Sequence, residues 1–411
     1  MSISTRPEPL VRLKPKVYNP SNVKHAPSSE QLKQAALHLK AGKCVAMPTE
    51  TVYGLAARFD LPKAVEAVFR IKERPSFDPL IVHVSTLDEA KNLTSNWSPL
   101  AQSLADAFWP GPLTMVLPKH EHVSSMITSG LDTVGIRMPR HPIALELIRL
   151  AGAPLAAPSA NRFGRTSPTS AHHVASEFPE AIAQGEVLIL DGGESDVGIE
   201  STVCMVQWSE NPSTQPHQVV ILRPGEITEA ELREHFLNTS STLNSVAVTR
   251  AMNNQASPGH TEHHYMPRKP LIVSWGDASL AELRDGAHTE SRNVNVRALW
   301  NQLQVSAKND PSLRILELDL SNDPTIAARK LYAELRNGDA DSDSDLLFIR
   351  RSIHDSLSHG GFQSKTSQDG MSQDETVVNF DKKNQSRESD LWAAIDDRLR
   401  RAARFNLGNP R

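Results

Sequence analysis

The stretch C-V-A-M-P-T-E-T-V-Y-G, residues 44–54, joins a short apolar run to a polar loop. The apolar residues before Pro48 predict a buried strand. Thr49 and Thr51 follow two residues apart, so in an extended chain their hydroxyls point to the same side. Because ligands of open α/β sheets bind outside the carboxyl ends of strands, both hydroxyls are candidate ligand contacts. The alternative is a capped turn from strand to helix, with Gly54 at positive φ.

Helical and strand patterns alternate on both sides of this stretch. Strands are predicted at residues 44–47, 80–84, 113–117, 134–138, 187–190 and 203–206. Helices are predicted from residue 28, where Ser28 is a plausible N-cap, from residue 62, at 98–108 and at 141–151. Strands and helices that interleave in this way predict an α/β domain over residues 28–237, after a flexible extension of residues 1–27.

The composition changes after residue 237. Residues 238–270 are rich in Ser, Thr, Asn and Pro, which is typical of a linker. Beyond it, strands are predicted at 271–275, 313–318 and 346–349, and helices at 326–335 and 391–405. These elements predict a second, smaller α/β domain over residues 271–411. Within it, residues 354–390 are rich in Ser, Gln, Asp and Gly and are predicted to be disordered.

Composition excludes several classes of protein. The 411 residues carry a net charge of −4, from 44 basic and 48 acidic side chains, which argues against an overall basic coat but not against a local basic cleft. No apolar run approaches the roughly 18 residues that cross a bilayer, so we expect no membrane partner. Cys44 and Cys204 are the only cysteines, which excludes a disulfide scaffold and a four-cysteine zinc site and favours a reducing, cytoplasmic location.

Common catalytic motifs are absent from the sequence. It contains no G-x-x-x-x-G-K-[ST], H-E-x-x-H, G-x-S-x-G or C-x-x-C pattern, which removes the simplest P-loop, protease, hydrolase and redox interpretations. His260, His263 and His264 only superficially resemble a metal tract, and we expect no metal site made of protein ligands.

Several cations stand where they are difficult to explain by packing alone. Lys72 and Arg74 precede Pro75, which disfavours helix at Arg74, so the two can converge where the helix ends; stabilisation of the helix dipole is the alternative. Arg137 lies in an apolar run and needs an anionic partner, either an internal carboxylate or a bound anion. His83 lies in another such run, where a satisfied core histidine is the alternative.

Other polar groups follow predicted strands. Ser159 and Asn161 stand two residues apart after the apolar run at 154–157, with an ordinary turn as the alternative. Ser201 follows a glycine-rich but acidic turn, and Arg223 ends another predicted strand.

In this order, the motifs resemble those of the YrdC-type threonylcarbamoyl-AMP synthases. The motifs are Pro48-Thr49-Glu50-Thr51-Val52-Tyr53-Gly54, Lys72-x-Arg74-Pro75, Trp109-Pro110-Gly111-Pro112-Leu113-Thr114, Arg137-Met138-Pro139, Pro158-Ser159-Ala160-Asn161, Glu200-Ser201-Thr202 and Arg223-Pro224-Gly225. The resemblance covers residues 28–236. Ser257-Pro258-Gly259 followed by His264-Tyr265-x-Pro267 is similar to the interdomain linker of the long two-domain form.

The resemblance implies a fold and a reaction. The fold is a twisted open α/β sheet with a concave basic cleft, followed by a smaller Rossmann-like α/β domain. The reaction is a nucleotidyl transfer that makes threonylcarbamoyl-AMP and pyrophosphate from L-threonine, bicarbonate or CO2, and ATP with Mg²⁺. It is the first step of the N6-threonylcarbamoyladenosine modification of tRNA, and it implies a partner complex that transfers the threonylcarbamoyl group. Direct contact with tRNA or double-stranded RNA is a further expectation. Cations that offset the repulsion between carboxylate, carbamate and triphosphate suffice, without a protein nucleophile.

The resemblance also implies a role for each matched residue. The core around the phosphates and the adenylate is Lys72, Arg74, Ser159 and Asn161. The threonine contacts are Thr51, His83, Arg137 and Ser201. The ATP contacts are Arg74, Asp78, Thr133, Ser159, Ser167, Arg223 and Tyr265, with Tyr265 reaching in from the linker as part of a lid. Thr49 is a weaker candidate. Asp78 stands where the family usually has Asn, so it could bind Mg²⁺ or weaken the affinity for nucleotide.

Two other functions remain to be weighed. A carbamoyl-adenylate enzyme of hydrogenase maturation would need zinc-finger and acylphosphatase-like segments, which a chain with two cysteines cannot supply. A non-catalytic RNA-binding module would bind RNA in a salt-sensitive way without turning over ATP. Such a module has no need of Ser159 and Asn161 beside Lys72 and Arg74, which favours the synthase.

Overall fold

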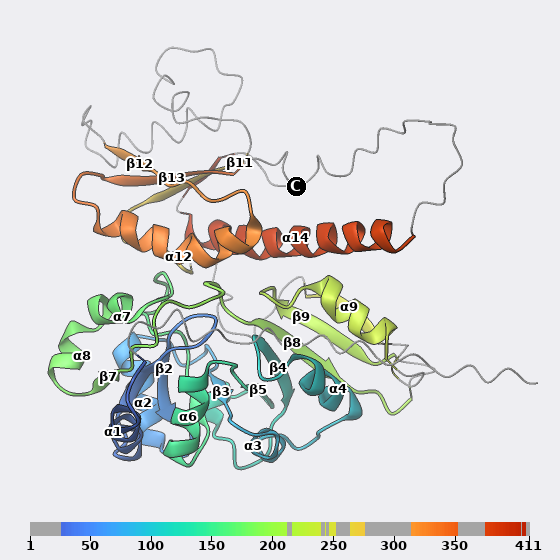
Figure 1. Ribbon diagram of the computed structural model, residues 1–411. Coiled ribbons are helices and arrows are strands. Elements are labelled where there is room, and N and C mark those ends of the chain that lie inside the picture. Colours follow the sequence, from blue (N-terminus) through green and yellow to red (C-terminus); the bar gives the residue numbers. More distant parts are fainter. Residues whose placement is uncertain are drawn as a thin grey trace, which may run out of the picture.

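A computed structural model describes residues 26–211, 216–239, 243, 246–251, 264–275, 314–351, 375–403 and 405–407. Figure 1 shows a larger unit with an extended sheet and a smaller unit stacked on it. Among the described residues, no helix combines the length and apolar character needed to cross a membrane. The expectations for residues 1–25, for Ser257-Pro258-Gly259 and for residues 354–374 lie outside the described part.

The larger unit is built on one mixed, ten-stranded sheet with the order β10-β9-β8-β4-β5-β3-β6-β2-β1-β7. Its strands are β1 Cys44–Met47, β2 Gly54–Arg58, β3 Ile81–His83, β4 Leu113–Pro118, β5 Thr133–Arg137, β6 Leu155–Ala156, β7 Val187–Ile189, β8 Thr202–Gln207, β9 Gln218–Arg223 and β10 Ala247–Arg250. The predicted α/β domain is confirmed, and each of its predicted strands lies within one or two residues of an observed one.

Helices pack on this sheet, and those that begin at residues 29, 62, 99 and 142 lie where the sequence predicted them. They are α1 Ser29–Lys40, α2 Pro62–Lys72, α3 Leu87–Asn92, α4 Pro99–Phe108, α5 Ser125–Thr128, α6 Pro142–Ala151, α7 Ala171–Glu177, α8 Pro179–Ala183 and α9 Glu229–Leu237. Ser28 caps α1, because its hydroxyl accepts from the Gln31 amide at 3.2 Å while the Gln31 side chain accepts from the Ser28 amide at 2.8 Å.

Two segments of this unit differ from the sequence-based expectation. Residues 48–53 form the loop of a β-hairpin, since β1 pairs antiparallel with β2 and Met47 lies opposite Gly54. The alternative expectation, a turn from strand to helix with Gly54 at positive φ, is therefore wrong. The chain turns into strand β2 instead, and Gly54 does not have a positive φ. Part of the predicted linker is also a strand, because β10 pairs in parallel with β9, with Ala247 opposite Gln218. The composition of the segment did not predict this strand, because two of its four residues are polar and exposed at the sheet edge.

The smaller unit is a four-stranded parallel sheet with two helices on the side that faces the larger unit (Figure 1). Its strands are β11 Leu271–Trp275, β12 Ile315–Glu317, β13 Leu346–Arg351 and β14 Phe405–Leu407, and its described helices are α12 Pro324–Ala340 and α14 Glu375–Ala402. This arrangement confirms the predicted second α/β domain.

Helix α14 corrects two sequence-based expectations. It begins at Glu375, so residues 375–390 are helical rather than disordered, and Phe405 belongs to β14 rather than to the helix. Polar residues such as Glu, Lys, Arg and Gln are good helix formers even without an apolar stripe. Two polar residues of α14 also contact the larger unit: Arg387 contacts Glu231 at 3.2 Å, and Asp390 contacts Arg250 at 2.6 Å.

The two units share an apolar core. One cluster of buried residues contains Val52, Val197 and Ile199 of the larger unit together with residues of α12 and α14. Gly198 lies directly against α12, where a Cβ would come within 2.4 Å of the Arg329 carbonyl oxygen. The second domain therefore packs on the loop that leads into β8.

Candidate active site

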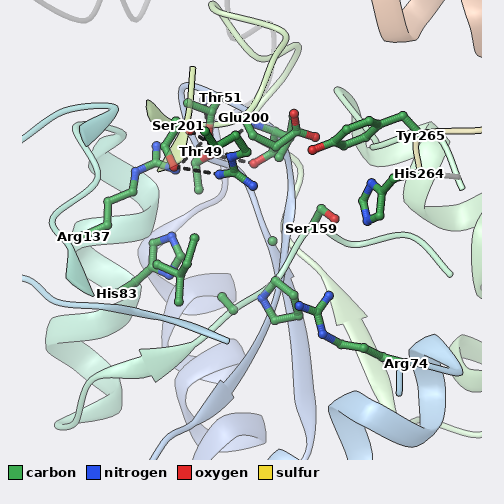
Figure 2. Close-up of a pocket in the computed structure, with 16 residues that line it drawn as sticks. Thr49, Thr51, Arg74, His83, Arg137, Ser159, Glu200, Ser201, His264 and Tyr265 are labelled. Carbon is green, nitrogen blue, oxygen red and sulfur yellow. Dashed lines mark hydrogen bonds between the residues drawn. The ribbon is translucent and has the colours of Figure 1, made fainter. Parts of the chain in front are cut away.

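A pocket lies against one face of the large sheet (Figure 2). Ile81 and His83 of β3 are two residues apart, so they point to the same face, and both line the pocket. Other lining residues end or follow strands, as His83 ends β3, Arg137 ends β5 and Thr49 follows β1. The lining residues are Thr49, Thr51, Val52, Gly54, Arg74, Ile81, His83, Arg137, Ala157, Pro158, Ser159, Glu200, Ser201, Arg223, His264 and Tyr265.

Arg137 is fixed by partners from the hairpin loop. Its guanidinium contacts the Glu50 carboxylate at 2.7 Å and donates to the Thr51 hydroxyl at 2.9 Å. Thr51 in turn lies 2.9 Å from the Thr49 hydroxyl, which donates to the Val52 carbonyl at 2.6 Å. The anionic partner that the sequence demanded for Arg137 is therefore an internal carboxylate.

Electrostatics support the charged state of this pair. Burial opposes ionisation of Glu50, but the positive charges of Arg137 and Arg140 hold the pKa of its carboxyl below the usual value. His83 lies opposite Arg137 in the register of β3 and β5. Burial, followed by the charge of Arg137, lowers the pKa of His83 to about 3, so the imidazole is neutral at physiological pH. This part of the pocket presents one arginine, one neutral histidine and two hydroxyls.

Lys72 and Arg74 converge as predicted where α2 ends. Glu73 adopts a left-handed conformation with φ 52°, which turns the chain out of the helix. The Lys72 ammonium donates to the Ser159 carbonyl at 2.5 Å and also to the Asn161 carbonyl. Its burial, with 1% of the residue exposed, lowers its pKa well below the usual value, and the charge of Arg74 adds to that effect.

Asp78 is the internal partner of Arg74. The Arg74 guanidinium contacts the Asp78 carboxylate at 2.9 Å and donates to the backbone carbonyls of Asp78 at 3.0 Å and Pro79 at 2.8 Å. The acid that departs from the family pattern thus holds a pocket arginine in place.

The four residues of the predicted core lie near one another, but only two of them line the pocket. They are Lys72, Arg74, Ser159 and Asn161. Arg74 and Ser159 line the pocket, while Lys72 and Asn161 lie outside its lining. The Asn161 amide donates to the Arg162 and Arg165 carbonyls, each at 2.8 Å. Lys72 and Asn161 therefore shape the loop that presents Ser159.

Ser201 and Arg223 form another wall. The Ser201 hydroxyl lies 2.8 Å from the Thr114 hydroxyl and accepts from Arg223 at 3.1 Å, and a second Arg223 nitrogen donates to the Ser201 carbonyl at 3.1 Å. Gly225 permits this contact, because a Cβ there would come within 2.7 Å of the Glu200 carbonyl oxygen.

The wall at Glu200 is built by both domains. Glu200 accepts from the Ser167 hydroxyl at 2.6 Å and from the Tyr332 hydroxyl of α12 at 2.8 Å, and it contacts Arg398 of α14 at 3.2 Å. The Ser167 hydroxyl is therefore engaged behind the pocket, and Ser167 does not line it.

His264 and Tyr265 enter the pocket from the predicted linker. Tyr265 is buried at φ 65°, its carbonyl accepts from the Thr166 hydroxyl at 3.1 Å, and its ring stacks on Tyr332 with centroids 5.6 Å apart. Its hydroxyl has no hydrogen-bond partner among the described residues. Burial and the charges of Arg74 and Lys72 lower the pKa of His264 well below its usual value.

Thr133 is a predicted ATP contact that lies away from the pocket. It begins β5 opposite Pro118, while Arg137 ends the same strand, so the two lie about 13 Å apart along it. Thr133 lines a separate groove with Asn96 and Trp208. The geometry therefore gives no support to a direct contact between Thr133 and a ligand of the pocket.

Sequence reasoning missed three residues that line or support the pocket. Glu50 stands between the two threonines, Glu200 precedes Ser201, and His264 precedes Tyr265, each next to a residue that was selected. The available signal was their position beside residues that were selected. Glu50 and Glu200 are buried carboxylates, and such groups need cationic or donor partners.

Figure 2 shows how the side chains divide the pocket. Arg137 and His83 lie on one side, Arg74, His264 and Tyr265 on the other, and Ser159 between them. Two arginines on opposite sides can bind two anionic groups in one cavity.

Comparisons with known proteins agree with this geometry. A family model described as "Telomere recombination" matches residues 38–225, and one described as "Threonylcarbamoyl-AMP synthase, C-terminal domain" matches residues 227–361. The threonylcarbamoyl-AMP synthase of Pyrococcus abyssi is 41% identical over 62% of this chain and 71% of that relative. The one from Schizosaccharomyces pombe is 39% identical over 72% of this chain and 77% of that relative.

A solved structure gives the same result for the whole architecture. The crystal structure of Pyrococcus abyssi Sua5 complexed with L-threonine aligns with a TM-score of 0.67 at 31% identity, over 94% of this chain and 99% of that chain. The chain therefore belongs to the threonylcarbamoyl-AMP synthase family, a family of enzymes, in its two-domain form.

Proposed function

We propose that this enzyme makes threonylcarbamoyl-AMP and pyrophosphate from L-threonine, bicarbonate or CO2, and ATP. The observation that carries the proposal is a single pocket with Arg137 on one side, Arg74 on the other and Ser159 between them. Membership of the synthase family supports the same reaction.

The threonine side of the pocket is the one around Arg137. A threonine carboxylate matches the Arg137 guanidinium, and the Thr51 and Ser201 hydroxyls and His83 supply hydrogen bonds at its edges. The neutral imidazole of His83 adds no second charge that would have to be compensated when the site is empty of substrate.

The ATP side of the pocket is the one around Arg74. Arg74 and Arg223 offset the charge of the phosphates, Ser159 donates from the loop that Lys72 and Asn161 hold, and Tyr265 closes the side. Asp78 orients Arg74 rather than standing free beside the nucleotide.

The reaction then requires positioning rather than a protein nucleophile. The threonine nitrogen adds to CO2 and loses a proton, which gives a carbamate. A carbamate oxygen attacks the α-phosphorus of ATP, the bond from that phosphorus to the bridging oxygen breaks, and pyrophosphate leaves with the electron pair. This is a nucleotidyl transfer, and the two arginine sides bring its anionic reactants together.

Mg²⁺ is proposed to enter with ATP, bound by phosphate oxygens. The described residues contain no group of three or more His, Cys, Asp or Glu side chains that could hold a metal ion. When bound, the ion would neutralise phosphate charge alongside Arg74 and Arg223.

We further propose that the product is passed to a threonylcarbamoyl-transferase complex that acts on tRNA. A cytoplasmic location fits the two cysteines, since Cys44 and Cys204 are both buried and unpaired.

Pyrophosphate release by the purified chain tests the proposal. With ATP and Mg²⁺, release is expected to require both L-threonine and bicarbonate, and Arg74→Ala is expected to abolish it. Release that ignores threonine would contradict the proposed substrate, and the absence of nucleotide binding would favour the RNA-binding module.

A further inference from the structure

The second domain reaches the pocket through one buried carboxylate. Glu200 lines the pocket, yet two of its three partners, Tyr332 at 2.8 Å and Arg398 at 3.2 Å, come from helices of the second domain. The third partner, Ser167, belongs to the first domain.

Arg398 is a costly residue to place at this position. It is 0% exposed, and apart from Glu200 it donates to the Pro224 carbonyl at 2.5 Å and the Ala394 carbonyl at 3.2 Å. A buried guanidinium is tolerated only with a carboxylate and further acceptors, so Arg398 and Glu200 each require the other.

The neighbour of Glu200 in the chain is a pocket residue. Ser201 presents its hydroxyl to the pocket, and its main chain is fixed by Arg223 and by the close approach of Gly225. The amide of Thr202 donates to the Pro112 carbonyl at 3.0 Å. Because a peptide bond joins Glu200 to Ser201, the contacts that anchor the Glu200 side chain add to these in fixing the position of the Ser201 hydroxyl.

The same two side chains also contact Tyr265. The Tyr332 ring stacks on it at 5.6 Å, and the Arg398 guanidinium lies 5.9 Å from its ring centroid. Tyr332 and Arg398 therefore contact both Glu200 and Tyr265, two residues that line the pocket.

We propose that Tyr332 and Arg398 are positioning residues for the substrate pocket, which act through Glu200 on Ser201. The proposal rests on the proposed function, because it assigns Ser201 to the threonine side. The second domain would then complete the threonine site although it contributes no threonine ligand of its own.

Two variants and one control test this inference in the full-length chain. Tyr332→Phe removes only the hydroxyl and keeps the ring against Tyr265, while Arg398→Met removes the charge and keeps much of the volume. Arg387→Met is the matched control, because Arg387 lies on the same helix and pairs across the domain contact with Glu231, but does not line the pocket.

The kinetic readout is the KM for each substrate in pyrophosphate release. Tyr332→Phe is expected to raise the threonine KM about fivefold, the loss of one hydrogen bond to a charged acceptor, and Arg398→Met to raise it further. In Tyr332→Phe, which keeps the ring against Tyr265, the ATP KM is expected to change less than the threonine KM, and Arg387→Met is expected to leave both within about twofold. An unchanged threonine KM in Arg398→Met, or equal rises in both KM values in Tyr332→Phe, would overturn the inference.

Hydrogen exchange separates this inference from the proposed function. In Tyr332→Phe and Arg398→Met, amides of residues 199–203 are expected to exchange faster than in the wild type and in Arg387→Met. If the wild-type chain shows no threonine-dependent release, the proposed function fails, and exchange alone then decides whether the second domain orders this segment. Unchanged exchange at residues 199–203 would refute the positioning role.

Discussion

The Arg137 side of the pocket and the wall at Glu200 are built in different ways. Around Arg137, the partners Glu50 and Thr51 come from one hairpin loop of the same domain. Around Glu200, the partners Tyr332 and Arg398 come from another domain, 132 and 198 residues further along the chain. The first side is a property of the catalytic domain, whereas the second exists only when both domains are docked.

This difference has a physical consequence for substitution. A change on the Arg137 side disturbs one buried ion pair, while a change on the Glu200 side disturbs the contact between domains. Substitutions at each place therefore distinguish the two kinds of contact.

The Glu50–Arg137 pair is expected to show the largest effect on stability. Arg137→Met leaves the fully buried Glu50 carboxylate without its cation and is expected to lower the free energy of unfolding by about 3–5 kcal/mol. Adding Glu50→Gln to that variant is expected to restore most of the loss, without restoring activity. Denaturant unfolding measures both values, and a double variant no more stable than Arg137→Met would contradict the pairing.

His83 is expected to make this side of the pocket sensitive to acid. Its pKa of about 3 in the folded chain lies below the ordinary value of 6.5, so between these values the unfolded chain binds more protons. Its contribution is full above pH 6.5 and is lost as the pH falls toward 3, by up to about 5 kcal/mol. His83→Gln should flatten the dependence of unfolding free energy on pH in this window. The exposed His122→Gln serves as control, and an equal flattening there would refute the assignment.

Substitution of Gly198 tests the contact between the two domains. Gly198→Ala introduces a Cβ within 2.4 Å of the Arg329 carbonyl at φ 77°, and we expect it to destabilise the chain by about 2–3 kcal/mol and to loosen the domain contact. Gly130→Ala is the matched control, since Gly130 has φ 81° but nothing within 4 Å of a Cβ, so only the backbone strain of about 1 kcal/mol remains. Thermal unfolding and limited proteolysis measure the difference, and equal effects would contradict the close contact.

Thr133 is expected to give the smallest effect. Because it lies at the far end of β5, Thr133→Ala should leave the KM for ATP within about twofold of the wild type. A tenfold rise would show that the resemblance located an ATP contact that the geometry does not.

The sequence allowed the self-contained parts of this structure to be predicted. Strand β1, helix α2 and the convergence of Lys72 and Arg74 depend on neighbours in the chain, so apolar spacing and Pro75 were sufficient. The need of Arg137 for an anion was also evident, although the choice of Glu50 required the hairpin register.

The parts that were missed depend on contacts between distant residues. The role of Glu200 could not be predicted, because its partners Tyr332 and Arg398 are brought to it only by the docking of α12 and α14. Strand β10 and the first turns of α14 have polar sequences that resemble linkers, and their pairing or packing is not visible in composition. The roles given to Thr133 and Ser167 came from motif resemblance, which does not fix where a side chain points.

A comparison of KM values for Arg137→Ala and Tyr265→Phe decides most clearly whether the pocket has a threonine side and an ATP side. Arg137→Ala is expected to raise the threonine KM by about 10- to 100-fold, the value of a hydrogen-bonded charge, with a much smaller change for ATP. Tyr265→Phe, whose hydroxyl has no partner among the described residues, is expected to raise the ATP KM by about two- to tenfold and to spare threonine. Equal rises for both substrates in each variant would contradict a pocket with a threonine side and an ATP side.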